Sequence, residues 1–497
     1  MLAIRFWLRY NKSVEIRESL SIDDAVHPDH LFSIHFLKEV FCLEKLFKLK
    51  EHGTNVRTEV VAGITTFLTM AYILAVNPNI LGSCMDRGGV FVATALASAI
   101  ATFVMAFLAN YPIALSAGLG LNAYFAYTVC LGELSDMGAD AFTVALTAVF
   151  VEGIIFIILS FFKAREQIIN GIPMNLKNGI SAGIGLFVAF IGLQNAGIIE
   201  KSDSTLVSLG SFSKPDVALA LIGFLIILVL VHYNVKGSVL IGILATWVLG
   251  MIAQATGWYV PDAEAGIASV FPDFSAGLQL SGLANTAFKF NFGWAASHLI
   301  QFIAIVFSFL YVDIFDTVGT VVGVADKAGL LDKDGKLPRV GKVLLADSIG
   351  TCAGACLGTS TITSFVESSA GVAAGGRTGL TSFTTGCMFL ISLLLSPIFL
   401  AIPGFATAPA LLYVGMLMVS SVKKIEFDGD IADVAGAYMA VLMMPLAYSI
   451  ATGIMFAILT WVIIKVAEKK AKDVSPVMWV VFALFVLRII TLITNFQ

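Results

Sequence analysis

Three acidic side chains lie inside long apolar stretches of this 497-residue chain. Asp313 and Asp316 share one such stretch, and Glu367 follows a run rich in Ser, Thr and Gly. An Asp in the middle of a membrane helix costs roughly 2.5–3.5 kcal/mol on insertion scales, so a function is expected for these acids. Residues three apart project from one side of a helix, so Asp313 and Asp316 should face the same way. When two carboxyl groups lie side by side away from water, the pKa of one of them is raised, and that group can then carry a proton.

Two further side chains are suited to a flat, aromatic ligand. Asn122 can offer a donor and an acceptor to a planar heterocycle, and Phe365 can stack on its ring. The structural alternative is that the acids cap broken helices and that Asn122 bonds a neighbouring helix. The hydroxyl groups of residues 359–364 would then return hydrogen bonds to backbone freed by the break. Glu152 and Asp347 have no broken segment beside them, so structural pairing is favoured for both.

The composition indicates what surrounds these residues. The chain is 58% hydrophobic and 13% charged, with a mean hydropathy of +0.91, whereas soluble domains carry about 25% charged residues. The apolar residues form runs of roughly 18 to 22, the length that crosses a bilayer as a helix. We therefore predict an all-α polytopic membrane protein. The net charge of −4 gives no reason to expect a nucleic-acid partner.

The apolar segments fall into two sets of seven. The first set covers about 60–81, 90–109, 113–131, 141–162, 178–198, 216–234 and 238–256, and the second about 297–322, 341–358, 359–375, 380–402, 406–422, 432–448 and 450–467. The predicted divisions are an N-terminal cytoplasmic segment 43–58, a first repeat 59–256, an extracytoplasmic loop 257–296, a second repeat 297–467 and a C-terminal hydrophobic helix 468–497. The stretch 477–495 carries Arg488, which favours a surface or packed helix over a further span.

Loop charges and broken segments predict the topology. Lys and Arg gather at the ends of the even-numbered segments, which places the N-terminus in the cytoplasm. Seven helices per half force the two halves into opposite orientations. Segments three and ten are each interrupted, at 116–122 and 358–371. Paired breaks at corresponding positions of two halves indicate a transporter's binding site.

The first 42 residues are polar and contain no apolar stretch long enough for a signal peptide. Lys38-Glu39-Val40 can be encoded by a ribosome-binding sequence, and Leu43 by the start codon TTG. One hypothesis is that the native protein begins at Leu43, with 1–42 as an upstream artefact. The alternative is a short disordered cytoplasmic tail.

Motifs for soluble chemistry are missing from the sequence. It has no Walker loop, no dinucleotide fingerprint and no zinc-protease motif. Cys352 and Cys356 have no His or further Cys nearby, so we expect neither a metal site nor a disulfide framework, and no cofactor. An enzyme is not expected, and any transport must draw on an ion gradient.

Several long motifs, in order, carry a resemblance to a known family. They are the stretches 44–59, 63–78, 117–125, 313–320 and 359–379. Together they resemble the bacterial adenine/guanine/hypoxanthine permeases, the purine branch of the nucleobase–cation symporters, over about residues 43–495. The resemblance implies the uracil-permease type of fold, with fourteen transmembrane helices in two inverted seven-helix repeats that form core and gate domains. Segments three and ten would carry short antiparallel strands.

The resemblance also implies a site and an activity, namely proton symport of purine bases across the inner membrane. Positions implicated in purine binding or transport correspond to Asn122, Asp313, Asp316 and Glu367, and Val366 with its neighbours would offer main-chain contacts. Thr317 stands where the uracil transporters have a His, which argues for the purine branch. Such proteins are often homodimers through their gate domains, embedded in membrane lipid.

Other functions on the same fold stay open at this point. One is a carrier for another small solute, an anion or a pyrimidine, and a second is a cation channel. An anion site would favour a cation at segment ten, whereas this segment is acidic. The sequence does not choose among adenine, guanine and hypoxanthine, and it does not assign which carboxyl group carries the proton.

Overall fold

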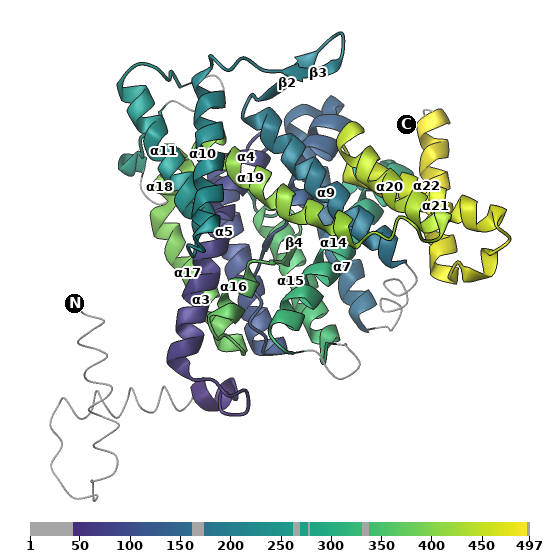
Figure 1. Ribbon diagram of the computed structural model, residues 1–497, viewed down its shortest axis with the longest axis horizontal. Helices are drawn as coiled ribbons and strands as arrows, with labels where there is room; N and C mark the ends of the chain where they lie inside the picture. Colours follow the sequence, from purple (N-terminus) through teal and green to yellow (C-terminus); the bar gives the residue numbers. More distant parts are fainter. Residues whose placement is uncertain (1–42, 162–172, 262–268, 277–278, 331–336, 495–497) are drawn as a thin grey trace, which may run out of the picture.

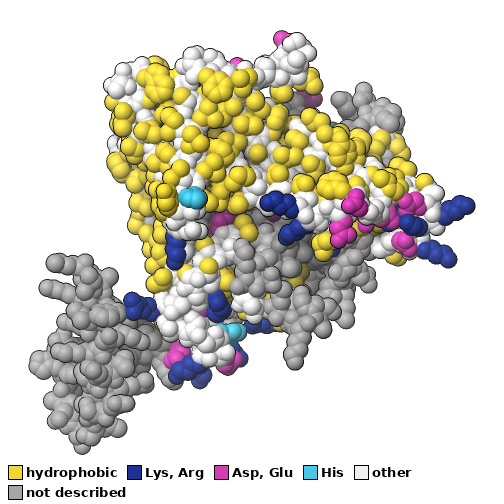
Figure 2. Space-filling model, viewed as in Figure 1, with side chains coloured by type: hydrophobic (Ala, Val, Ile, Leu, Met, Phe, Trp, Pro, Cys, Tyr) yellow, Lys and Arg dark blue, Asp and Glu magenta, His cyan; other side chains and the backbone are white. Residues whose placement is uncertain are grey.

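The computed structural model describes residues 43–161, 173–261, 269–276, 279–330 and 337–494. The suspected leader 1–42 lies outside these ranges. Within them, ten helices are long and apolar enough to cross a membrane, and three shorter apolar helices accompany them. The chain is thus a multi-pass helical membrane protein, and the full count of fourteen spans stays a prediction. Figure 2 shows hydrophobic side chains over the upper part of one face, with charged side chains along its lower border.

The first half runs from the N-terminal helix to the end of the seventh predicted segment (Figure 1). Its elements are α3 (Val56–Met70), α4 (Ile73–Leu81), α5 (Arg87–Val104), β1 (Leu115–Ala117), α6 (Leu119–Ala123), α7 (Ala141–Phe161), α9 (Met174–Asn195), the hairpin β2 (Ile199–Ser202) and β3 (Leu206–Leu209), α10 (Pro215–His232) and α11 (Ser238–Ala255). Short π-helical turns follow α5 at Met105–Ala109 and α6 at Tyr124–Glu133.

The second half follows the loop after α11. Its elements are α12 (Leu283–Thr286), α13 (Phe292–Ser297), α14 (Leu299–Lys327), α15 (Val340–Leu357), β4 (Ile362–Ser364), α16 (Ser368–Ala373), α17 (Gly379–Ser392), α18 (Ser396–Ala401), α19 (Gly404–Val419), α20 (Ile431–Leu446), α21 (Ile450–Ala467) and α22 (Pro476–Thr494). The C-terminal α22 packs beside α21 and α14, where the Phe485 ring lies 5.3 Å from that of Phe307.

Short polar side chains fix where several helices begin. The Asn55 side chain accepts the Thr58 N–H at the start of α3, and Asp86 accepts the Gly89 N–H at the start of α5. Such caps satisfy donors that the first turn of a helix leaves unpaired. In lipid these donors have no water to bond, so the capping residues set the helix ends.

The two interrupted segments meet as a pair of short strands. β1 and β4 pair antiparallel, with Ser116 opposite Thr363, as predicted for segments three and ten. The outer edges of the pair are satisfied by threonines from neighbouring helices. Thr102 of α5 bonds both the N–H and the carbonyl of Leu115, and Thr351 of α15 donates to the Ile362 carbonyl. Each threonine comes from the second segment of its half, so the two halves support their strands in the same way.

The helices pack into two groups (Figure 1). One group, the core, joins α3, α5, α7, α14, α15, α16 and α17 around the strand pair. The other, the gate, joins α9, α10, α11, α19, α20 and α21. Glycines allow the gate helices to approach closely, since a Cβ added at Gly183 of α9 would lie 2.6 Å from the Ala440 carbonyl of α20. The names core and gate are used below for these two packing groups, and the core and gate domains that the resemblance implied stay a prediction.

Hydrogen bonds join core and gate at the upper end of the bundle in Figure 1. The Asn79 side chain of α4 donates to Thr407 of α19 and to the Ile402 carbonyl, each at 3.3 Å. Arg87 donates to the same carbonyl at 2.9 Å. Nearer the strand pair the contact is apolar: a Cβ at Gly120 of α6 would lie 3.1 Å from Ile184 of α9.

Candidate substrate site between the interrupted segments

Glu367 lies just after β4, at the entrance to the short helix α16, and is half-buried. Its Oε1 accepts a hydrogen bond from the Tyr72 hydroxyl at 2.6 Å. The Thr69 hydroxyl, on the same end of α3, lies 3.4 Å from the Glu367 carbonyl oxygen and 2.8 Å from the Thr66 carbonyl oxygen of its own helix. No other residue in the described ranges donates to the carboxylate. One oxygen is therefore fixed by the protein, and the other is available to a ligand.

The residues just before Glu367 differ in exposure. Phe365 is only 5% exposed, and its N–H donates to the Ala114 carbonyl at 3.0 Å. Its ring lies in the apolar core, so this conformation does not present it for stacking. The neighbouring Val366 is 45% exposed, so other protein atoms cover only part of it. The structure thus presents Val366 and Glu367 together and keeps Phe365 behind them.

Asp313 lies in a buried network beneath the strand pair. The Thr317 hydroxyl is 2.7 Å from Asp347 Oδ2, 3.3 Å from Asp313 Oδ1 and 2.9 Å from Thr363 Oγ1. Ser364 donates to the other Asp347 oxygen at 3.4 Å. Two carboxyl groups therefore approach a single hydroxyl. Asp347 accepts hydrogen bonds from two neighbouring segments, which fits the structural pairing that the sequence favoured, and it belongs to the same network as Asp313.

Asp316 points to a different part of the site. A Cβ added at Gly118, at the junction of β1 and α6, would lie 3.5 Å from Asp316 Oδ2. Asp316 is half-buried, and its carboxyl group is close enough to Glu367 for their charges to interact. Among the residues that the structure describes, no ion pair involves either acid. The helix thus directs Asp313 toward β4 and Asp316 toward Glu367 and the first broken segment.

Asn122 connects the two broken segments. It is fully buried, and its Oδ1 accepts a hydrogen bond from the Ser360 hydroxyl. Its Nδ2 lies 3.5 Å from the Ala117 carbonyl. These contacts match the inter-segment amide that the sequence left as the alternative to ligand binding.

The structural alternative expected the hydroxyl groups around β4 to bond the backbone freed by the break, but their partners are different. Thr359 accepts from the Asn77 side chain of α4 at 2.9 Å, and Thr363 bonds Thr317 of α14. They contact side chains of other segments, because the freed backbone is already bonded by Thr102 and Thr351. The break is therefore stabilised from outside segment ten.

Tyr72 and Thr69 are the site residues that sequence reasoning did not single out. Both lie at the end of α3, where the helix stops at Met70 and resumes as α4 at Ile73. A signal existed, because Tyr72 falls within the conspicuous stretch 63–78. In the described part of the chain, no group of three or more His, Cys, Asp or Glu could hold a metal ion.

A mostly helical bundle with a polar site between two interrupted membrane segments defines a multi-pass membrane protein of the transporter class. The Permease family model matches residues 57–456. A guanine/hypoxanthine permease, PbuO of Bacillus subtilis, is 45% identical over 450 residues, which cover 90% of this chain and all of that protein. The adenine permease AdeP of Escherichia coli is 41% identical over 450 residues, or 90% of this chain and 96% of that protein. The chain belongs to this permease family, alongside adenine and guanine/hypoxanthine permeases.

A solved structure shares the fold at low sequence identity. The transmembrane domain of the cyanobacterial bicarbonate transporter BicA superposes with a TM-score of 0.61 at 15% identity, covering 80% of this chain and 97% of that domain. At this identity the likeness concerns the fold alone.

Proposed function

We propose that this protein takes up purine nucleobases by proton symport across the plasma membrane, with its N-terminus in the cytoplasm. The observation that carries the proposal is the half-buried Glu367 carboxylate, with one oxygen held by Tyr72 and the other without a donor from another residue in the described ranges. Purine bases present ring and exocyclic N–H groups that such an oxygen accepts. The names of the relatives support the same class of substrate.

The charge of the site favours a neutral or weakly basic ligand. Asp316 and Glu367 lie close together, and among the described residues neither forms an ion pair. An anion such as bicarbonate would meet two carboxyl groups with no cation to offset them. A base that donates N–H groups to Glu367 and meets the backbone at Val366 fits this environment better.

The proton of the symport is assigned to the carboxyl groups at the site. Asp313 and Asp347 share the Thr317 hydroxyl, and Asp316 approaches Glu367. A proton taken up by any of them offsets charge that would otherwise have to cross the membrane uncompensated. One proton moving inward at about 150 mV supplies roughly 3.5 kcal/mol, enough for about 300-fold accumulation of a neutral base.

Alternating access is proposed as a movement of the core against the gate. The site lies on core segments, and the apolar contact of Gly120 with Ile184 faces the gate. An apolar contact of this kind can slide without breaking hydrogen bonds. A homodimer through the gate is part of the same proposal. A cation channel is the alternative, and it would pass ions without accumulating a base.

Uptake of radiolabelled hypoxanthine into cells that lack their own purine carriers tests the proposal. We expect saturable accumulation that collapses with a protonophore. Unlabelled adenine, guanine or hypoxanthine should compete, and uracil should not. Uptake that does not exceed the outside concentration, or that a protonophore leaves unchanged, would contradict symport. Competition by bicarbonate and not by purines would contradict the substrate class.

A further inference from the structure

Tyr72 occupies a position from which it can control Glu367. It lies in the break between α3 and α4 and is only 1% exposed. Its hydroxyl donates to Glu367 Oε1 at 2.6 Å, across 295 residues of sequence. A buried tyrosine hydroxyl needs a partner, and this carboxylate supplies it. The break between the two helices thus sets the position of Tyr72, and the hydrogen bond from Tyr72 in turn sets the position of the Glu367 carboxylate.

A second, longer contact from the same turn reaches the backbone of Glu367. Thr69 lies three residues before Tyr72, and its hydroxyl reaches the Glu367 carbonyl oxygen at 3.4 Å. The carbonyl and carboxylate of Glu367 are therefore both contacted by the end of α3. A half-buried glutamate side chain has three rotatable bonds, and Tyr72 is the one side chain in the described ranges that donates to its carboxylate.

We propose that Tyr72 is a positioning residue for substrate binding, which fixes the Glu367 carboxylate so that Oε2 meets an N–H group of the base. This inference rests on the proposed function, because it takes Glu367 as the acceptor for the base. Tyr72 itself does not contact the ligand in this arrangement. It fixes the Glu367 side chain before the base binds, so binding does not carry the entropic cost of ordering that side chain.

Replacing Tyr72 by Phe removes one oxygen atom and keeps the ring that fills the break. The carboxylate of Glu367 then loses its only described donor and must be ordered by the base itself. A hydrogen bond to a charged group contributes more than one between neutral groups, so we expect KM for uptake to rise about 10-fold or more. Because binding weakens while the moving parts stay intact, Vmax per transporter should change less than about twofold.

Tyr111→Phe is the matched control. Tyr111 is also 1% exposed, and its hydroxyl donates to a carbonyl group, that of Pro338, at 2.5 Å. The substitution makes the same chemical change at a buried tyrosine away from the strand pair. Its KM should stay within about twofold of the unsubstituted protein. KM does not depend on the amount of protein, so reduced abundance of either variant does not obscure the comparison.

Glu367→Gln, measured beside these variants, separates the two proposals. Loss of uptake in Glu367→Gln together with a raised KM in Tyr72→Phe supports both. Loss of uptake in Glu367→Gln with the same KM in Tyr72→Phe and Tyr111→Phe overturns the role of Tyr72 alone. Normal uptake by Glu367→Gln overturns the assignment of Glu367, and with it the proposed site. A fall in Vmax without a change in KM for Tyr72→Phe also contradicts positioning.

Discussion

Two glutamates beside α3, Glu59 and Glu367, show how differently this fold uses a buried carboxyl group. Glu59 is fully buried and accepts from the backbone N–H groups of Arg377, Thr378 and Thr381 at 2.9, 3.2 and 3.2 Å. The Thr381 hydroxyl donates to it as well, at 2.6 Å. Glu59 therefore caps the start of α17 from another helix, whereas among the other described residues Tyr72 alone donates to the Glu367 carboxylate.

The difference separates structure from function. A carboxylate with all of its acceptor positions used by the protein stabilises a helix start, as helix N-termini favour negative charge. It has nothing left to offer a ligand. A carboxylate with one oxygen held by the protein has a fixed orientation, and its other oxygen can still accept a hydrogen bond. Such a carboxylate is suited to binding a ligand that donates hydrogen bonds. Glu59 is fully buried and Glu367 half-buried, and the number of donors around each separates them further.

The largest effect is expected at the open carboxylate. Glu367→Gln replaces an acceptor by an amide, and Asp313→Asn does the same in the network around Thr317, so we expect each to reduce purine uptake at least 100-fold. Abundance in the membrane and melting temperature should stay close to the unsubstituted values. Immunoblots of membranes and uptake assays on the same cells measure both. Normal accumulation by both variants would show that these acids are not the site.

A loss of stability rather than of function is expected at the saturated carboxylate. Glu59→Ala leaves three buried N–H groups and a hydroxyl without an acceptor, at about 1–3 kcal/mol each. We expect much less protein in the membrane and a clearly lower melting temperature, with an unchanged KM in the protein that remains. A raised KM with normal abundance would place Glu59 in the binding site and remove the contrast with Glu367.

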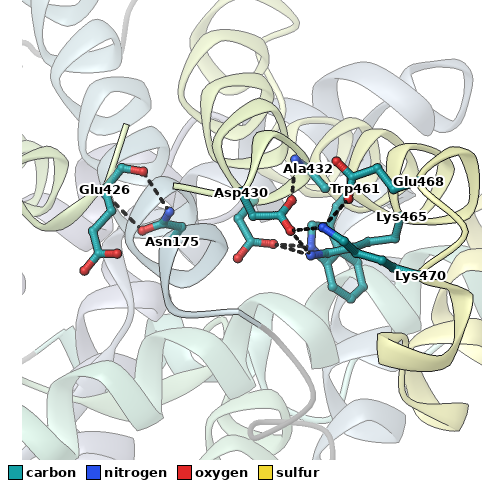
Figure 3. A network of polar contacts seen from close by, with 9 residues as sticks. Asn175, Glu426, Asp430, Ala432, Trp461, Lys465, Glu468 and Lys470 are labelled. Carbon is teal, nitrogen blue, oxygen red and sulfur yellow. Dashed lines mark hydrogen bonds and ion pairs between the residues drawn. The ribbon is translucent and has the colours of Figure 1, made fainter. Parts of the chain in front are cut away.

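The smallest effect is expected at Asp430, a partly exposed carboxylate at the start of α20 (Figure 3). Asp430 lies 2.8 Å from Lys465 Nζ and 3.0 Å from Lys470 Nζ, and it accepts the Ala432 N–H at the start of α20. The hydrogen bond from Lys465, followed by that from Lys470, holds the pKa of Asp430 below its ordinary value. A lowered pKa means stability that is present above about pH 4, the pKa of an unfolded Asp, and is lost as the pH falls further.

Asp430→Asn should therefore lower the stability of the gate by about 1 kcal/mol or less at pH 7, as such pairs near the surface contribute little. The difference in melting temperature from the unsubstituted protein should shrink as the pH falls below about 4. Uptake at neutral pH should be nearly normal. A loss of uptake as large as that of Glu367→Gln would mean that this cluster takes part in transport.

The apolar segments and their breaks could be predicted from the sequence because length and composition determine them. A run of about 20 apolar residues has few alternatives to a membrane helix, and the Gly- and Ser/Thr-rich stretches around Gly118 and Ser360 cannot continue one easily. The strands β1 and β4 follow the predicted positions. The family resemblance, carried by five motifs, is confirmed by the family match over residues 57–456.

The partners of the buried acids could not be predicted, because they depend on how helices rotate against each other. Asp313 and Asp316 are three residues apart, yet one bonds the Thr317 network and the other approaches Gly118 and Glu367. Asp347 joins that network from a separate helix. Tyr72 needs the break after α3 to reach Glu367. No spacing in the sequence encodes these contacts across hundreds of residues.

The pairing of β1 with β4 has a consequence for how the protein is made. Thr102 bonds the backbone of Leu115, but the rest of β1 pairs with β4, and these strands belong to opposite halves of the chain. Ile362 is synthesised about 245 residues after Ala117, which at roughly 5–20 residues per second takes about 12–50 s. During that interval the first half sits in the membrane with an unpaired strand, which lipid cannot satisfy. Insertion factors or water must shelter it, so truncations that end before residue 362 should be degraded rather than accumulate as a stable half-protein.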